Sequence, residues 1–259
     1  MALLKNEYPI LEYDTAARAI FDFKDLKDDL KEVVFPEKAV FAFLGNCIDD
    51  LAKSMGAEII YNIDSITKDY PIYVIEYKGE RICLCQAPMG APAALQNLEM
   101  LLLCGVKKVI SAGSCGVLQD IPENQFIIPT KALRDEGCSY HYLPPSRFVD
   151  LDMPMTEHIR RTFSEKAIPF SEGTTWTTDG LFRETHEMVE YRKNEGCLTV
   201  DMECAALAAC AKFRGTDLGM FFFTADSLAD IEAYDIRDFG KASLVPALHL
   251  CLDIIASAR

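Results

Sequence analysis

The chain is 259 residues long, half of them hydrophobic and one quarter charged, a composition that excludes a disordered protein and fits a folded globular one. Its 26 basic and 40 acidic residues leave a formal net charge of −14. That charge repels phosphate backbones, which argues against nucleic-acid binding as a main task. Because the chain has no linker, repeat or low-complexity tract, we expect residues 1–259 to form a single domain.

The ten cysteines are scattered along the chain, with no CxxC motif and no zinc-like spacing with histidine. We therefore expect reduced thiols and no metal site. No stretch approaches the roughly 18 apolar residues of a membrane span. The first residues carry Lys5, Glu7 and Glu12, unlike the apolar core of a signal peptide. Together these features predict a cytoplasmic protein that does not enter a membrane.

Apolar runs of strand length alternate with segments of helical periodicity, and this alternation predicts an α/β fold. Lys78 and Gly79 suit a hairpin turn, and residues 134–150 are expected to form a long loop. In chain order, the expected strands are 39–44, 72–77, 81–87, 106–112, 126–129, 198–200 and 219–224, and the expected helices are 92–104, 155–166, 202–213 and 243–258.

A run of small residues, Ala-Gly-Ser-Cys-Gly at 112–116, follows the expected strand 106–112. Small side chains let a ligand approach the backbone, and exposed N–H groups can bind an anion. The same residues also suit a tight turn, and the pattern alone leaves both interpretations open. An acyl hydrolase that uses Ser114 or Cys115 is disfavoured, because the first glycine of a nucleophile elbow is absent.

Two carboxylates, Asp201 and Glu203, lie where a strand passes into a helix. A carboxylate at such a junction can accept hydrogen bonds from the two vicinal hydroxyls of a sugar, and it can also cap the helix. Asp201 by itself suits a cap. Glu203 enters an Ala-rich helix that is expected to be buried, which favours a ligand-binding role.

Asp226 directly follows the Phe-rich strand 219–224. An acid at the end of a buried strand can serve as a general acid or can cap the next segment. The only tryptophan, Trp176, could form a wall for an aromatic base together with Leu181 and Phe182, although aromatic side chains more often lie in the core.

Taken in order, these motifs resemble the purine nucleoside and uridine phosphorylase family. The resemblance runs from about residue 39 to the C-terminus, and it rests on Met89-Gly90, the segments 111–116 and 200–205, and Ala225-Asp226. It implies a three-layer α/β/α single domain with a mixed, curved central sheet. It also implies a homodimer or a higher homo-oligomer, with no cofactor and with phosphate as co-substrate.

The resemblance further implies a pentosyltransferase of nucleoside metabolism and purine salvage. In such an enzyme phosphate attacks the sugar of a nucleoside, and Asp226 would protonate a purine base at N7. An acid near the base and anionic groups near the sugar match the charges that develop as the bond breaks. The ribose would be held by Glu203, Met202, Met89 and Ser114, the phosphate by Gly45, Gly113 and Ser114, and the base by Trp176, Leu181, Phe182 and Val200.

Two arginines that hold phosphate in this family are absent from the matching positions. Asp49 stands where the first is expected, and Ser111 stands where the second is expected. A phosphate dianion beside Asp49 without an arginine is electrostatically poor. The candidates for a substitute cation are Lys68, Arg134 and Arg147.

Phosphorolysis of a purine nucleoside is the first prediction. The missing arginines favour an alternative, a nucleosidase in which water replaces phosphate and Asp201 or Glu203 activates that water. A second alternative is a nucleoside-binding protein of the same fold without turnover. The phosphate dependence of base release separates the first two functions, and any turnover excludes the third.

Overall fold

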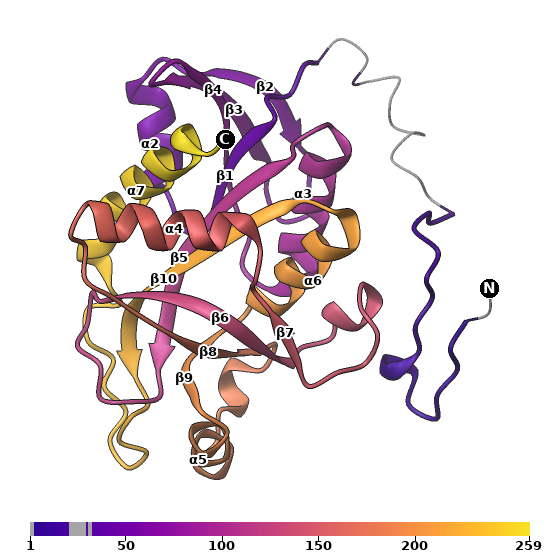
Figure 1. Ribbon diagram of the computed structural model, residues 1–259, viewed down its shortest axis with the longest axis vertical. Helices are drawn as coiled ribbons and strands as arrows, with labels where there is room; N and C mark the ends of the chain where they lie inside the picture. The colour runs from indigo at the N-terminus through magenta and orange to yellow at the C-terminus, as the bar shows by residue number, and fades with distance from the viewer. Residues whose placement is uncertain (1–2, 21–29, 31–32) are drawn as a thin grey trace.

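A computed structural model of the chain describes residues 3–20, 30 and 33–259 (Figure 1). Ten strands of this part of the chain belong to one sheet. They are β1 (Lys38–Ala42), β2 (Glu58–Ile63), β3 (Tyr70–Tyr77), β4 (Glu80–Gln86), β5 (Lys108–Val117), β6 (Phe126–Asp135), β7 (Phe148–Asp150), β8 (Phe170–Thr178), β9 (Cys197–Asp201) and β10 (Asp217–Ser227).

The helices connect these strands or cover their faces. The α-helices are α2 (Cys47–Ser54), α3 (Ala91–Leu103), α4 (Pro154–Glu165), α5 (His186–Asn194), α6 (Cys204–Arg214) and α7 (Leu244–Ser257), and the 3-10 turns are η1 (Pro9–Leu11), η3 (Ser139–His141), η4 (Leu181–Arg183) and η5 (Lys241–Ser243). None of these helices is both long and apolar enough to cross a bilayer, as far as the described residues go.

The sheet is mixed and strongly curved. β10 pairs with β5 in parallel and with β6 in antiparallel orientation, while β8 joins β6 to β9 and β9 pairs back onto β5. These five strands therefore close into a ring. On the other side of β5, the strands β1, β4, β3 and β2 continue the sheet as an open extension.

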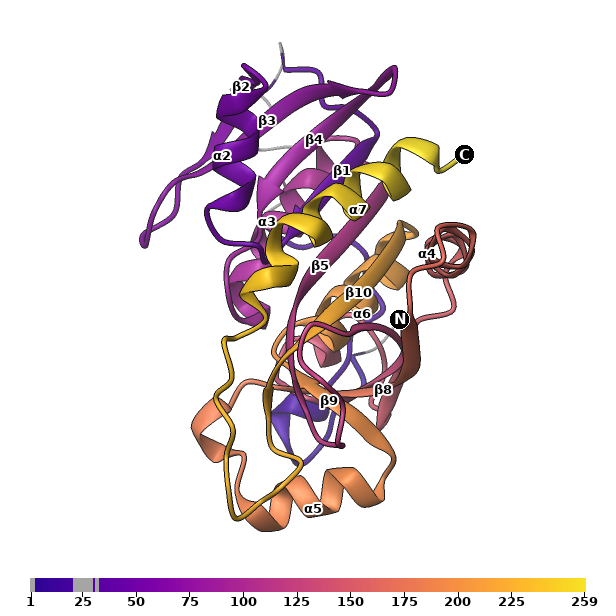
Figure 2. The ribbon, with the colours of Figure 1, turned by 90° about the vertical axis from the view of Figure 1, so that its left-hand side faces the viewer.

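Strand β1 shows how the sequence builds a core on each face of the sheet. Successive side chains of a strand point to opposite faces. Accordingly, Ala39 and Phe41 pack into the core that α3 and α6 cover, while Val40 and Ala42 pack into the core that α2, α4 and α7 cover. Figures 1 and 2 show these two helical layers on either side of the sheet. The predicted three-layer α/β/α domain with a mixed, curved sheet is confirmed.

Most expected elements are present, with shifted ends. The expected hairpin is formed by β3 and β4, and both turn residues, Lys78 and Gly79, have positive φ angles of 51° and 81°. The small residues at 113–116 lie inside β5, so the interpretation of a tight turn there is wrong. The expected loop 134–150 is also partly wrong, because Arg134 still belongs to β6 and β7 begins at Phe148.

Five of the described strands and α-helices are missing from the expected set: α2, β2, β7, β8 and α5. β8 is rich in threonine, and α5 has the polar sequence HEMVEYRKN, so neither carries a strong apolar periodicity. Their conformation depends on neighbours that are distant in sequence. β8, for example, lies between β6 and β9 and pairs with both.

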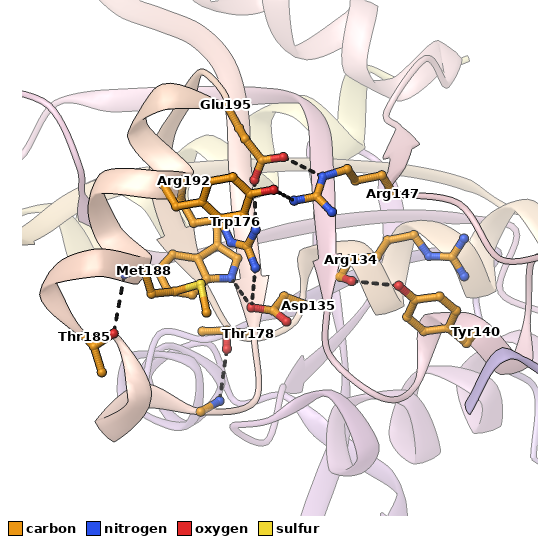
Figure 3. A network of polar contacts seen from close by, with 12 residues as sticks. Arg134, Asp135, Tyr140, Arg147, Trp176, Thr178, Thr185, Met188, Arg192 and Glu195 are labelled. Carbon is orange, nitrogen blue, oxygen red and sulfur yellow. Dashed lines mark hydrogen bonds and ion pairs between the residues drawn. The ribbon is translucent and has the colours of Figure 1, made fainter. Parts of the chain in front are cut away.

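A network of polar contacts holds α5 against the sheet (Figure 3). The guanidinium of Arg192 is buried and donates hydrogen bonds to Asp135 Oδ2 at 3.1 Å and to Glu195 Oε2 at 2.8 Å. The indole N–H of Trp176 donates to the same oxygen of Asp135 at 2.8 Å, and Arg192 lies 5.4 Å from the centre of the Trp176 ring system. On the surface, Arg147 binds the other oxygen of Glu195.

We expect Arg192→Ala to lower the free energy of unfolding by about 3 kcal/mol, because it leaves Asp135 and Glu195 without their buried cation. Arg147→Ala removes an exposed cation from the same Glu195 and should cost less than about 1 kcal/mol. Urea unfolding followed by circular dichroism measures both values. Equal losses for the two variants would contradict the structural role of Arg192.

Candidate functional site

A cavity of about 980 Å³ opens at the carboxyl ends of β1, β4, β5 and β10. These four strands are parallel along β4–β1–β5–β10, so their carboxyl ends meet at one edge of the sheet. The junction between β9 and α6 and the segment that includes η4 complete the wall. This is the position where open α/β sheets bind small molecules.

Nearly all the candidate residues from the sequence line this one cavity. They approach it from segments far apart in the chain: Gly45, Met89, Gly113, Ser114, Leu181, Phe182, Val200, Met202, Glu203 and Asp226. Met89 and Phe182 are strongly exposed, at 77% and 95%, and so lie at its mouth.

Trp176 does not belong to the described lining of the cavity. Its ring is buried, with 1% exposed, and packs in a separate cluster with Val189 and Val200. The alternation of β8 explains this placement. Thr175 and Thr177 face Asp201, so Trp176 between them must face the other way, toward α5. The expected wall for a base therefore lacks Trp176.

Asp201 is buried, with 7% of its surface exposed, and accepts four hydrogen bonds. Thr175 Oγ1 and Thr177 Oγ1 donate to its Oδ1 at 3.0 and 2.9 Å. The backbone N–H groups of Glu203 and Cys204 donate to its Oδ2 at 2.8 and 2.6 Å. Burial raises the pKa of Asp201, whereas these four donors favour its charged form. Because both of its oxygens already accept hydrogen bonds, Asp201 stabilises the start of α6 and is not available to activate a water.

Glu203 is the carboxylate that faces the cavity at this junction. The N–H of Gly90 donates to its Oε1 at 2.6 Å, and Gly90 has a φ of 91°, which favours glycine. Burial, followed by the charge of Asp201, raises the pKa of Glu203 to about 8. One oxygen of Glu203 is thus anchored to the backbone at Gly90, and the backbone of Met202 also favours the charged form of this carboxyl group.

Asp226 lies near the end of β10, half-buried in the wall of the same cavity. The hydroxyl of Tyr234 donates to its Oδ2 at 2.9 Å. Burial and this contact raise the pKa of Tyr234 to about 12, so the phenol keeps its proton at neutral pH.

Gly116 lies close to the same wall. A Cβ at Gly116 would lie 2.9 Å from Val200 Cγ1 and 3.4 Å from Asp226 Oδ1, so a side chain there would crowd this wall.

Of the three cations considered as substitutes for the missing arginines, only Lys68 reaches the cavity. Its Nζ donates to Gln86 Oε1 at 2.7 Å. Arg134 is buried and donates to Ser139, Ser146 and two backbone carbonyls of the loop that follows β6. Arg147 lies on the surface, where it binds Glu195 and Tyr191. Arg134 and Arg147 are therefore not among the residues of the described chain that line this cavity.

Asp49 and Ser111, which stand in place of the family's arginines, are not among the described lining residues either. Asp49 accepts a hydrogen bond from the Tyr73 hydroxyl at 3.1 Å, and Ser111 is fully buried within β5. The described residues also offer no group of three His, Cys, Asp or Glu side chains that could hold a metal ion.

Sequence patterns missed several polar residues that line the cavity, among them Glu184, Tyr234, Asp230 and His186. They lie in or beside irregular segments after η4 and β10, where no periodicity marks them. Among these residues, the carboxyl group of Glu184 has the most strongly shifted pKa. Burial, together with the charge of Asp226, raises the pKa of Glu184 to about 7.

The raised pKa of Glu203 predicts how stability depends on pH. Its folded value of about 8 exceeds the roughly 4.3 of an unfolded chain, so the folded state binds the proton more tightly. The free energy of unfolding should therefore fall as the pH rises from 5 to 8.

Glu203→Gln should remove this part of the pH dependence and keep an acceptor for Gly90. Relative to the wild type, the variant should gain on the order of 2 kcal/mol between pH 5 and 8.5. Urea unfolding at a series of pH values measures the difference, with the exposed Glu187→Gln on α5 as control. Parallel profiles for Glu203→Gln and the wild type would contradict the expectation.

The sequence matches the Phosphorylase superfamily over residues 38–249. A guanosine phosphorylase of Halorubrum lacusprofundi is 25% identical over 153 residues, which cover 59% of this chain and 64% of the relative. A DeoD-type purine nucleoside phosphorylase of Actinobacillus pleuropneumoniae is 31% identical over 146 residues, which cover 55% and 61%. The matches thus span about three-fifths of these curated relatives.

Solved structures show the same fold. A uridine phosphorylase from Vibrio fischeri ES114 superposes with a TM-score of 0.74 at 22% identity, covering 86% of this chain and 93% of that one. An AMP nucleosidase from Bacteroides thetaiotaomicron superposes with a TM-score of 0.69 at 21% identity, covering 86% and 88%. Because the superfamily match includes β1, the cavity-lining motifs and β10, this chain belongs to the Phosphorylase superfamily.

Proposed function

We propose that this protein cleaves the N-glycosidic bond of a purine nucleoside, with phosphate as the acceptor of the sugar. The observation that carries the proposal is that a single cavity holds both Glu203, a carboxylate suited to sugar hydroxyls, and Asp226, an acid at the end of β10. Relatives named as guanosine and purine nucleoside phosphorylases support it. The homo-oligomeric state and the cytoplasmic location inferred from the sequence stay predictions.

On the sugar side, Glu203 accepts hydrogen bonds from the ribose 2′- and 3′-hydroxyls through the oxygen that Gly90 does not occupy. Met89 and Met202 offer apolar surface to the ring beside it. In its ionised form, which dominates above its pKa of about 8, Glu203 also stabilises the positive charge that develops on C1′ as the bond to the base breaks.

On the base side, Asp226 donates a proton to N7 of the purine as the C1′–N9 bond breaks. The bonding electrons move onto the base, and the proton neutralises them, which gives the neutral free base. The Tyr234 hydroxyl occupies one oxygen of Asp226 and so orients the carboxyl group for that transfer. A phosphate oxygen attacks C1′, and the sugar leaves as ribose 1-phosphate.

The phosphate would lie near Gly45, Gly113 and Ser114, with Lys68 as its cation. Lys68 is the only Lys or Arg among the described lining residues, and its ammonium group has one hydrogen bond, to Gln86. An ammonium has three donors, so it can bind an anion without breaking that contact.

The charge balance of the wall favours a second candidate function, hydrolysis. Lys68 faces five carboxyl groups in the described lining: Glu184, Asp201, Glu203, Asp226 and Asp230. Those of the five that are ionised repel a phosphate dianion but not water. Since Asp201 already accepts four hydrogen bonds, Glu203 would be the base that activates the water.

The first experiment incubates the purified protein with adenosine, inosine and guanosine, with and without phosphate, and measures free base by chromatography. Base release that requires phosphate supports phosphorolysis, and equal release without phosphate supports hydrolysis. No base release under either condition would refute both functions and favour a binding protein.

Under phosphorolysis, Lys68→Met should raise the KM for phosphate about tenfold and leave the KM for the nucleoside unchanged. Lys53→Met, on the exposed end of α2, is the control.

Asp226→Asn should reduce kcat on a purine nucleoside by about 10²- to 10⁴-fold, the usual effect of losing a general acid. The amide is close in size and still accepts the Tyr234 hydrogen bond, so the fold should survive. Asp238→Asn changes an exposed carboxylate that binds Lys241 and serves as the matched control. A loss smaller than tenfold for Asp226→Asn would show that the base leaves without this proton.

A further inference from the structure

One carboxyl group in the cavity has no part in the proposed mechanism. Glu184 follows η4 and lines the same cavity as Asp226. Within the described chain, no backbone or side-chain group donates a hydrogen bond to its carboxylate. Other carboxyl groups of the cavity have such partners: Asp226 has Tyr234, Asp201 has four donors and Glu203 has Gly90. Glu184 is thus available to a ligand.

Glu184 is close enough to Asp226 for the two charges to interact. Both charges also contribute to the raised pKa of Tyr234. The other ionisable groups of the described lining are Asp201, Glu203, Asp230, His186, Lys68, Tyr70 and Cys115. The phenol of Tyr234 already donates to Asp226, so it does not neutralise Glu184. Two carboxyl groups whose charges interact therefore line one cavity: Asp226 accepts a hydrogen bond from Tyr234, and Glu184 accepts none from the described residues.

The chemistry of a purine connects these two groups. N7 and the substituent on C6 lie next to each other on one edge of the base. If Asp226 reaches N7, a second carboxyl group beside it reaches the C6 substituent. Purine nucleosides differ there in a way that a carboxyl group can detect, because a 6-amino group donates a hydrogen bond and a 6-oxo group accepts one.

We propose that Glu184 is a specificity-determining residue that reads the C6 substituent of the purine, an inference that rests on the proposed function. As a carboxylate it accepts a hydrogen bond from a 6-amino group. As a carboxylic acid it donates one to a 6-oxo group. The protonation state of this one side chain thus sets the preference between 6-aminopurine and 6-oxopurine nucleosides.

The preference must then change with pH. Since burial and Asp226 raise the pKa of Glu184 to about 7, the acid form dominates below pH 7 and the carboxylate above it. The ratio of kcat/KM for adenosine to kcat/KM for inosine should therefore rise about tenfold between pH 6 and pH 8.5. Groups that act on both substrates alike, including Glu203 and the acceptor of the sugar, cancel from this ratio.

The test measures that ratio for the wild type, for Glu184→Gln and for the exposed control Glu187→Gln. An amide both donates and accepts without titrating, so Glu184→Gln should show a ratio that does not change with pH, while the control should follow the wild type. A flat ratio in the wild type, or a pH-dependent ratio that persists in Glu184→Gln, would overturn the proposal.

Calorimetric titration with the free bases adenine and hypoxanthine separates this inference from the proposed function. If no nucleoside is cleaved but the affinity ratio of the bases shifts with pH in the wild type and not in Glu184→Gln, the cleavage activity is wrong and the role of Glu184 stands. If nucleosides are cleaved without that shift, the activity stands and the role of Glu184 is refuted. Binding of neither base, together with no cleavage, refutes both.

Discussion

The candidate site depends on one buried carboxylate. Asp201 accepts two hydroxyl hydrogen bonds from β8 and two backbone hydrogen bonds from the start of α6. It thereby connects β8, the end of β9 and the start of α6. The position of Glu203, two residues later, depends on this junction. An ionised group buried so completely is tolerated because four donors replace its hydration shell. Asp201, one of the two acids that the sequence offered as a possible water-activating base, therefore stabilises the structure of this junction.

The cavity concentrates negative charge, and its chemistry follows from how each acid is held. Asp201 accepts four hydrogen bonds, Glu203 accepts one from the Gly90 N–H, and Asp226 accepts one from the Tyr234 hydroxyl, whereas no group of the described residues donates a hydrogen bond to the Glu184 carboxyl group. Burial, followed by the charge of a neighbouring carboxyl group, raises the pKa of Glu203 and of Glu184, with Asp201 as the neighbour of the first and Asp226 as the neighbour of the second. Groups that titrate near neutral pH in one pocket suit proton transfer and recognition of a neutral base, and Lys68 is the one Lys or Arg of the described lining.

Much of the fold was predictable because its strands are strongly apolar. The runs of Ala39 to Leu44 and Gly219 to Thr224 pack on both faces and so leave a clear pattern, and Lys78-Gly79 marks its hairpin through turn chemistry. β8 and α5 were not predictable, since their threonines and charged residues are stabilised by partners far away in sequence, such as Asp201 and Asp135. The side on which Trp176 lies depended on the register of β8, which no local pattern reveals.

For the site, the sequence alone determined which residues stand at the ends of strands: Met89, Ser114, Glu203 and Asp226 follow or end apolar runs, and parallel strands bring such ends to one edge. Only the tertiary structure decided which acids are free and which are occupied, because hydrogen-bond donors such as Thr175, Gly90 and Tyr234 come from other elements. It also decided that Lys68 reaches the cavity while Arg134 and Arg147 do not. The amino-acid type determines which charge a side chain can carry. Its hydrogen-bond partners, its burial and its pKa depend on the residues that surround it in the folded protein.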